Sequence, residues 1–450
     1  MDISLSSHFT YKKLFRFVVP SVIMMIFTSI YNVVDGIYIS NLVGKTQFAA
    51  LNMIYPYVMI FAAIGFMVGT GGTALISKTI GEGDHKKAND IFSMLVCFML
   101  IIGIICGLIG YFSLRKVAVF LGATGDMVDY CVNYARILMP AVVFFMLQGA
   151  FQALMVAADK PRLGMWITIL SGIINIVLDA LLIGVFHLEL EGAAAATAIS
   201  QVFGGIVPII YFLRKNDSLL RLGKPVWDFK SLVRTCTNGA SEFVTNVSVS
   251  VVEMLYNYQL MRLIGENGVA AFGVISYLMF IFIAAFLGYS VGVAPVIGFN
   301  YGAQREEELQ NVFRKSLVII GVTCLLMFLT GFIFAKPLAD IFVSSDIELE
   351  ALTIRALRFC SLAYIIIGFN IFGSAFFTAL NNGGVSATIS FLRTLVFQVI
   401  TILILPIFMG TDGVWISQFI SEVMALCVIV FFTVKMNKRY HYMSEKAISV

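Results

Sequence analysis

The chain has 450 residues, of which 60% are hydrophobic and only 12% are charged, and its mean hydropathy is +0.94. Soluble domains have about 45 to 50% apolar and about 25% charged residues, so this composition excludes an ordinary soluble protein and indicates a polytopic membrane protein. The net charge of +4 gives no indication of nucleic-acid binding.

The N-terminal region shows no cleavable signal. Lys12, Lys13 and Arg16 lead directly into an apolar run over residues 17–43. A run of this length crosses a hydrocarbon layer of roughly 30 Å, which needs about 20 helical residues. It is too long for a signal core and has no small-residue cleavage site. We therefore expect it to be the first membrane span.

Apolar runs separated by polar or glycine-containing breaks recur along the whole chain and predict an all-α protein with twelve transmembrane helices. The first six are expected near residues 15–42, 48–79, 90–114, 128–158, 163–186 and 192–213. The second six are expected near residues 235–262, 269–297, 312–335, 350–379, 385–409 and 413–435.

The basic residues predict the orientation of these helices. If the N-terminus lies inside, 21 of the 30 Lys and Arg residues fall in cytoplasmic segments and eight on the opposite side, while only Arg393 lies well inside a span. Because cytoplasmic loops carry an excess of Lys and Arg, this division predicts a multi-pass protein of the cell's inner (plasma) membrane with both termini in the cytoplasm.

The longest polar break, at residues 214–234, divides the chain into an N-terminal lobe (1–213), a cytoplasmic linker (214–234) and a C-terminal lobe with a short tail (235–450). The two halves are copies of one another. A shift of 221 residues places Gly44 on Gly265, Gly81 on Gly302 and Phe92 on Phe313. Six helices per half make the repeat parallel, with a pseudo-two-fold axis along the membrane normal, and transporters are often built this way.

Asp35 is the acidic residue of the first span. A carboxylate in a membrane helix costs about 2.5 to 3.5 kcal/mol on insertion scales, so it marks an ion or proton site by default. The alternative is a protonated carboxyl that only bonds a neighbouring helix. Asn175 and Asp179 of the fifth span are four residues apart and therefore share one helix face.

Several motifs together resemble the multidrug and toxic compound extrusion (MATE) family. They are the two six-helix halves, the polar turn at residues 81–88 and its counterpart at 298–305, Pro20 fifteen residues before Asp35, and the pair Asn175 and Asp179. The last two features fit the DinF-related branch, near its MepA-like members. The resemblance covers nearly the whole chain.

The resemblance implies a site in the N-terminal lobe made of Asp35, Asn175, Asp179 and Thr197. These would form an all-oxygen pocket, which suits a hard cation, and two close carboxyls can equally share a proton. The alternative is a polar contact that merely fixes helix packing. The other bacterial branch has a cation site in the C-terminal lobe with an aspartate in the tenth helix. Here Asn370 is the polar residue of that helix, so such a site is not expected.

Other polar residues inside the spans have two interpretations. Glu242 and Glu253 of the seventh helix, Gln148 and Asn370 are candidates for substrate binding, with structural roles as the alternative. Tyr256 takes the position of Asp35 in the second half. Pro20 predicts a bend in the first helix, because proline removes an intrahelical hydrogen bond. Arg393 either neutralises an acid of the C-terminal lobe or extends to the interface, and Glu422 is expected to join helices.

Seven scattered cysteines and four distant histidines show no metal or redox spacing, so no metal centre is expected beyond a possible Na⁺ at the coupling site, and no cofactor. There is no P-loop, HExxH or nucleophile elbow, which disfavours an enzyme. No obligatory protein partner is evident.

The resemblance therefore implies a secondary antiporter that exports amphipathic, often cationic, organic compounds in exchange for H⁺ or Na⁺. A flippase for a lipid-linked precursor is the main alternative. Its anionic pyrophosphate would require several embedded basic residues, and Arg393 alone is well embedded. The six-plus-six construction disfavours a channel.

Overall fold

The computed structural model describes residues 5–43, 45–343 and 347–443, and the regular elements of these segments are helical. The first half contains six long helices, the fifth of which ends in a π-helical segment, η1. They are α1 (Tyr11–Leu42), α2 (Lys45–Gly81), α3 (His85–Phe120), α4 (Asp126–Ala157), α5 (Pro161–Asp179) with η1 (Ala180–Val185), and α6 (Glu189–Leu213).

The second half repeats this order with more interruptions. Its helices are α7 (Phe229–Leu263), α8 (Glu266–Gly302), α9 (Glu306–Ile333), α10 (Ala335–Val343), α11 (Ile347–Ser361), α12 (Tyr364–Ala379), α13 (Gly383–Phe391) with η2 (Leu392–Val396), α14 (Phe397–Met409) and α15 (Thr411–Tyr440). The all-helical prediction is confirmed.

The expected spans all correspond to helices, with three differences. Ten helices of the described chain are long and apolar enough to cross a membrane, and α11 with α12 forms an eleventh span that bends by 49° where one helix was predicted over 350–379. The remaining expected span, 235–262, corresponds to α7, which has 35 residues but is too polar to be counted among these helices. The short α10 was not predicted, because nine residues are too few for a periodic pattern.

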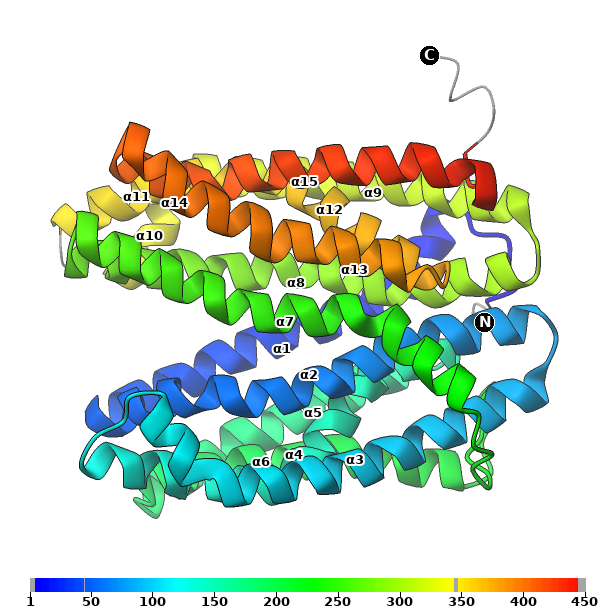
Figure 1. The fold of residues 1–450 in the computed structure, drawn as a ribbon, viewed down its shortest axis with the longest axis horizontal. Helices are drawn as coiled ribbons and strands as arrows, with labels where there is room; N and C mark the ends of the chain where they lie inside the picture. The colour runs from blue at the N-terminus through cyan, green and yellow to red at the C-terminus, as the bar shows by residue number, and fades with distance from the viewer. Residues whose placement is uncertain (1–4, 44, 344–346, 444–450) are drawn as a thin grey trace.

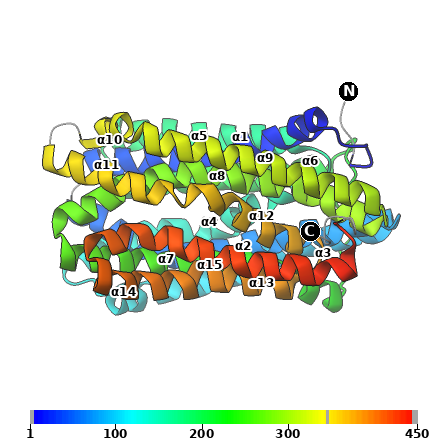
Figure 2. The same ribbon diagram turned by 90° about the horizontal axis from the view of Figure 1, so that it is seen from above.

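Figure 1 shows two helical lobes, one built from α1 to α6 and one from α7 to α15, with their long axes roughly parallel. The start of α1 and the end of α15 lie at the same end of the molecule, as the perpendicular view also shows (Figure 2). We call it the terminal end, and the other the distal end. Phe92 and Phe313, which are equivalent in the repeat, lie in the two hydrophobic cores. Phe92 packs on Phe212 in the first lobe, and Phe313 packs on Phe376 in the second.

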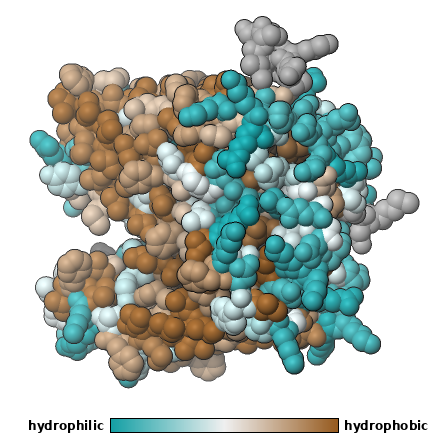
Figure 3. Space-filling view, turned by 45° about the vertical axis from the view of Figure 1, so that its right-hand side comes forward, coloured by the Kyte–Doolittle hydropathy of each residue, from teal (hydrophilic) through white to brown (hydrophobic). Residues whose placement is uncertain are grey.

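The polarity of the surface changes along the long axis of the molecule. Hydrophobic residues cover both lobes, whereas hydrophilic residues gather at the terminal end (Figure 3). The exposed apolar side chains include Leu108, Phe112 and Leu326, at 55 to 78% exposure. A broad apolar surface of this kind suits lipid rather than water. Between the lobes, the same view shows a hollow at the distal end.

Helix α1 belongs to the first lobe but also packs against α8 of the second. The contact is close because α8 presents Gly288 and Gly292 to the α1 backbone: a Cβ on Gly288 would stand 2.5 Å from the Cα of Val22. Two glycines four residues apart allow helices in membranes to approach in this way. The helix is continuous through Pro20, so the bend there stays a prediction.

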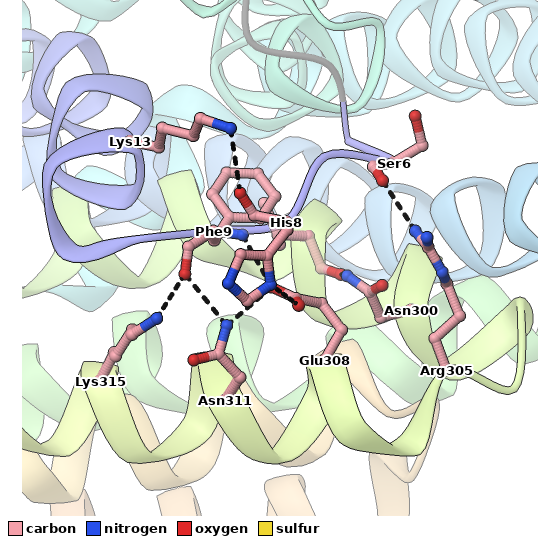
Figure 4. Close-up of polar contacts among 10 residues, drawn as sticks. Ser6, His8, Phe9, Lys13, Asn300, Arg305, Glu308, Asn311 and Lys315 are labelled. Atoms are coloured by element: carbon pink, nitrogen blue, oxygen red, sulfur yellow. Dashed lines mark hydrogen bonds and ion pairs between the residues drawn. The ribbon is translucent and has the colours of Figure 1, made fainter.

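The segment before α1 is bound to the second lobe at the terminal end (Figure 4). Glu308 of α9 accepts a hydrogen bond from the Phe9 amide at 2.8 Å and contacts His8 Nδ1 at 2.6 Å. Lys315 Nζ and Asn311 Nδ2 donate to the Phe9 carbonyl at 2.6 and 3.0 Å. The start of the first lobe is therefore attached to the second through several polar contacts.

Candidate functional site

The first lobe holds two carboxyl groups that interact with each other, one from α1 and one from α5. Asp35 comes from α1 and Asp179 is the last residue of α5, and the two carboxyl groups interact electrostatically with each other. Asp179 is fully buried. Both of its oxygens and Oδ1 of Asp35 receive no hydrogen bond from the described residues. A hydrogen bond between these two acids therefore requires a proton on one of them.

The backbone changes its winding directly after Asp179. The α-helix ends there and the next six residues, Ala180–Val185, form the wider π-helix η1. Such segments are rare and frequently lie at functional sites. Here the wider turn begins at the residue that carries the carboxyl.

Asn175 and Thr197 extend this group by one helical turn. Asn175 is 2% exposed, and its Nδ2 donates to Oγ1 of Thr197 on α6 at 3.5 Å. Because Asn175 lies four residues before Asp179, its amide and the Asp179 carboxyl share one face of α5. The structure thus brings the four predicted residues into one region of the first lobe. We call Asp35, Asn175, Asp179 and Thr197 the acidic cluster.

Three tyrosines near the acidic cluster were missed in the sequence analysis. Asp35 interacts electrostatically with Tyr31 of α1, Tyr55 of α2 and Tyr134 of α4. Tyr31 lies four residues before Asp35 and so shares its helix face, which was a signal in the sequence. Tyr55 and Tyr134 come from other helices, and no pattern in the sequence pointed to them. Their rings give the cluster an aromatic surrounding, which favours contact with an organic cation.

The second lobe has different chemistry at the equivalent place. Tyr256 is 4% exposed, and its hydroxyl bonds to Ser417 at 2.7 Å and to Gln398 at 3.3 Å. The position equivalent to Asp179 is Thr401, which is bonded to its own helix. The second lobe therefore has no pair of acids at these two positions.

The second lobe instead holds a buried ion pair between η2 and α15, at positions that are not equivalent to Asp35 and Asp179. Arg393 of η2 donates through Nε to both carboxylate oxygens of Glu422 on α15, at 3.1 and 3.0 Å. Asn370 of α12 donates to Oε2 of Glu422 at 2.5 Å and to its backbone carbonyl at 2.8 Å. Glu422 is 1% exposed. We call Asn370, Arg393 and Glu422 the charged triad.

The first lobe has a neutral version of this triad. Gln148 donates to Ser171 Oγ at 3.0 Å, and the Ser171 hydroxyl donates to the carbonyl of Ser200 at 2.7 Å. Each of these residues lies 222 positions before its counterpart: Gln148 before Asn370, Ser171 before Arg393, and Ser200 before Glu422. This spacing is one residue longer than the shift of 221 that relates Gly81 to Gly302, and it relates one lobe to the other. It gave no signal for the pairing of Arg393 with Glu422 within one lobe.

The candidates Glu242 and Glu253 lie on α7, away from the acidic cluster. Both are half-buried. Glu242 interacts electrostatically with Arg393 of the charged triad, whereas Glu253 has no such interaction with another described charge. The described residues contain no group of His, Cys, Asp and Glu that could hold a metal ion, and the seven cysteines are free.

The sequence is similar to curated bacterial exporters over nearly its full length. A multidrug export protein MepA from Staphylococcus haemolyticus is 26% identical over 433 residues, which cover 95% of this chain and 94% of the relative. The MepA of Staphylococcus aureus strain MRSA252 is 25% identical over 423 residues, with 93% and 92% covered.

The fold matches a solved multidrug resistance MATE transporter in an outward-facing conformation, with a TM-score of 0.90, 24% identity, and 96% and 97% of the two chains covered. The MatE family matches twice, at residues 20–181 and 243–404, once in each lobe. These two matches cover most of the chain and follow its internal repeat, and the chain therefore belongs to the MatE family of multidrug and toxic compound extrusion transporters.

Proposed function

We propose that this protein exports amphipathic organic cations across the plasma membrane in exchange for an inward-moving cation. The observation that carries the proposal is the pairing of Asp35 with Asp179 in the interior of the first lobe. Embedded acids are costly and usually functional. The curated relatives named multidrug export proteins support the direction and the substrate class.

Coupling needs a group whose affinity for the driving ion differs between two conformations, since a ligand shifts an equilibrium only by its differential affinity. Two neighbouring carboxyls meet this need, because their separation and their access to water change the affinity for a proton. We favour H⁺ over Na⁺, because two neighbouring carboxyl groups in the interior of a membrane protein can share one proton.

In this scheme the substrate cation and the driving ion compete for the same charge. When Asp35 or Asp179 is ionised, the pair attracts an organic cation into the space near Tyr31, Tyr55 and Tyr134. Protonation from outside removes that charge, releases the cation and allows the lobes to return. Asn175 and Thr197 orient the helix face that carries the Asp179 carboxyl.

The arrangement of the lobes supports alternating access around this site. The hollow lies at the distal end (Figure 3), and the terminal end is held by the N-terminal segment and by close helix contacts. With the termini placed in the cytoplasm, as the basic residues predict, this is an outward-facing state. The flippase remains the weaker proposal, because an anionic pyrophosphate would meet an acidic cluster.

The test is transport in proteoliposomes that contain the purified protein and a fluorescent organic cation. A pH gradient and a Na⁺ gradient are imposed separately, in both orientations. We expect export of the dye to follow the pH gradient and to be abolished when the gradient is collapsed. Export driven by Na⁺ alone would assign the coupling to Na⁺, and movement independent of both gradients would overturn the antiport proposal.

A further inference from the structure

A cavity of about 500 Å³ lies in the second lobe between α9 and α11. Its lining begins at Phe332, next to the last residue of α9, and continues with residues of α11 and of the break that follows it. Helix α11 lies at the distal end of the molecule (Figure 1). Small-molecule sites have volumes of about 300 to 1,000 Å³, so this cavity can hold a ligand, and the export scheme gives it no role.

The cavity combines apolar walls with two arginines. Phe332, Ile354 and Leu362 contribute apolar surface, and Arg355 and Arg358 are the charged residues of the lining. The two arginines are three residues apart and therefore share one face of α11. Both arginines and Phe332 are exposed, so the cavity opens to the surroundings of the protein. A molecule with a hydrocarbon part and an anionic part fits such a lining.

Arg358 makes no ion pair with a carboxylate of the described residues. Its guanidinium lies 5.9 Å from the centre of the Phe332 ring, in a cation–π contact. Such a contact uses the face of the ring and leaves the five N–H donors of the guanidinium without an acceptor among the described residues. The side chain is therefore oriented by Phe332 and free to bind an anion.

Arg355 is only partly neutralised by a neighbouring acid. One of its terminal nitrogens donates to Asp412 at 2.6 Å. The nearby Lys336 and Glu350 pair with each other at 4.0 Å. Two arginines and one aspartate thus leave one positive charge in excess at the cavity. This excess matches the single negative charge of a phosphodiester and repels an organic cation such as the proposed substrate.

The arginines lie level with the ends of the neighbouring helices. Arg358 contacts Phe332 at the end of α9, and Arg355 contacts Asp412, the second residue of α15. Long basic side chains near helix ends reach the headgroup region while their apolar neighbours remain in hydrocarbon. The cavity therefore has its charge where lipid phosphates lie and its apolar walls where acyl chains lie.

We propose that this cavity binds a phospholipid with a net negative charge. The phosphate binds Arg358 and the remaining nitrogens of Arg355, because the planar guanidinium donates two parallel hydrogen bonds to a phosphate. An acyl chain lies along the apolar wall toward Leu362. This residue lies in the break where α11 and α12 bend by 49°, so the lipid fills the space beside the bent span. The inference does not depend on the proposed export function.

The test is native mass spectrometry of the purified full-length protein with two lipids. Dioleoylphosphatidylglycerol is anionic, and dioleoylphosphatidylcholine has the same chains without a net charge. We expect the protein to retain phosphatidylglycerol in preference to phosphatidylcholine, and equal retention would overturn the inference. Inorganic phosphate is the third probe, because it has the charge without a chain. It should not displace the lipid, and displacement would assign the cavity to a free anion instead.

Two variants test the two parts of the cavity separately. Arg358→Gln should lower the affinity for phosphatidylglycerol about tenfold or more, because charge-assisted hydrogen bonds to the phosphate are lost. Ala351→Trp keeps both arginines but places a large side chain at a lining position, so it should lower the same affinity by excluding the chain. Both positions are exposed, which allows the variants to fold.

The matched control is Arg262→Gln. Arg262 is another exposed arginine of the second lobe, in the last turn of α7 and outside this cavity, so its loss should leave the affinity for phosphatidylglycerol unchanged. An equal loss in Arg262→Gln and Arg358→Gln would show a general attraction to basic residues and overturn the site. Wild-type affinity in Arg358→Gln or in Ala351→Trp would overturn it as well.

Discussion

Gly81 at the end of α2 lies against the backbone of α8, and Gly302 at the end of α8 lies against the backbone of α2. A Cβ would stand 2.1 Å from the Phe299 carbonyl oxygen at the first position and 2.0 Å from the Lys78 carbonyl oxygen at the second. The two glycines are equivalent in the repeat. The terminal end is therefore closed by contacts that only a residue without a side chain permits.

This relationship predicts that Gly302→Ala opens the terminal end. The added methyl group cannot be accommodated without separating the two helices, and overpacking of this kind typically costs about 1 to 3 kcal/mol. Spin labels at Lys86→Cys and Glu307→Cys, on a cysteine-free background, should show a longer distance. Gly384→Ala is the control, because its Cβ would meet no atom within 4 Å. An unchanged distance distribution in Gly302→Ala would contradict the prediction.

The acidic cluster predicts that gradient-driven efflux needs both Asp35 and Asp179. Asp35→Asn fixes the neutral form of that side chain, so gradient-driven efflux should fall below about one tenth of wild type while the protein still folds. Asp179→Asn should be comparably damaging, and Asn175→Ala or Thr197→Ala milder. The measurement is dye efflux from proteoliposomes under a pH gradient.

The control for this series is Glu253→Gln, which lies outside the acidic cluster and should keep substantial efflux. If Asp35→Asn retained full gradient-coupled efflux and Glu253→Gln lost it, the coupling site would lie in the second lobe.

The contact between Glu308 and the N-terminal segment predicts that loss of the Glu308 carboxylate loosens this segment. Glu308→Ala removes the acceptor of the Phe9 amide and the partner of His8, and a hydrogen bond to a charged group contributes about 1.5 to 3 kcal/mol. Hydrogen exchange of the peptide that contains Phe9 should accelerate. The neighbouring, exposed Glu307 provides the control as Glu307→Ala, and equal exchange in both variants would show that the contact does not hold the segment.

The orientation of the chain in the membrane predicts which positions a membrane-impermeant thiol reagent reaches from outside. Lys116 and Lys224 are both exposed, but the distribution of basic residues places them on opposite sides of the membrane. After replacement by cysteine on a cysteine-free background, position 116 should label from outside in intact cells and position 224 only after permeabilisation. Labelling of position 224 in intact cells would overturn the topology.

Pro20 predicts a defect in transport without a defect in folding. It lies in α1 beside Val18 and Ser21, which pack on Gly292 of α8. Proline leaves one backbone carbonyl of the helix without its usual donor, so Pro20→Ala should straighten and stiffen α1 and lower the export rate several-fold, with an unchanged melting temperature as the folding control. Wild-type export kinetics would show that the proline is passive.

The sequence by itself determined the class and the repeated architecture. Long apolar runs have one stable solution in a membrane, because every backbone polar group must bond within its own helix, and the shift of 221 residues from Gly81 to Gly302 set the two halves in register. It also indicated Asp35 as a functional residue, because a carboxyl in a membrane span raises the free energy of insertion.

Only the tertiary structure decided which side chains meet. Asp35 and Asp179 lie on different helices, so the interaction of their carboxyls depends on how α1 packs against α5. The same holds for the pairing of Arg393 with Glu422, and for the bend between α11 and α12, whose span reads as one continuous helix in the sequence. These helices are apolar on nearly every side, so hydrophobic periodicity does not indicate which face of one helix meets the next.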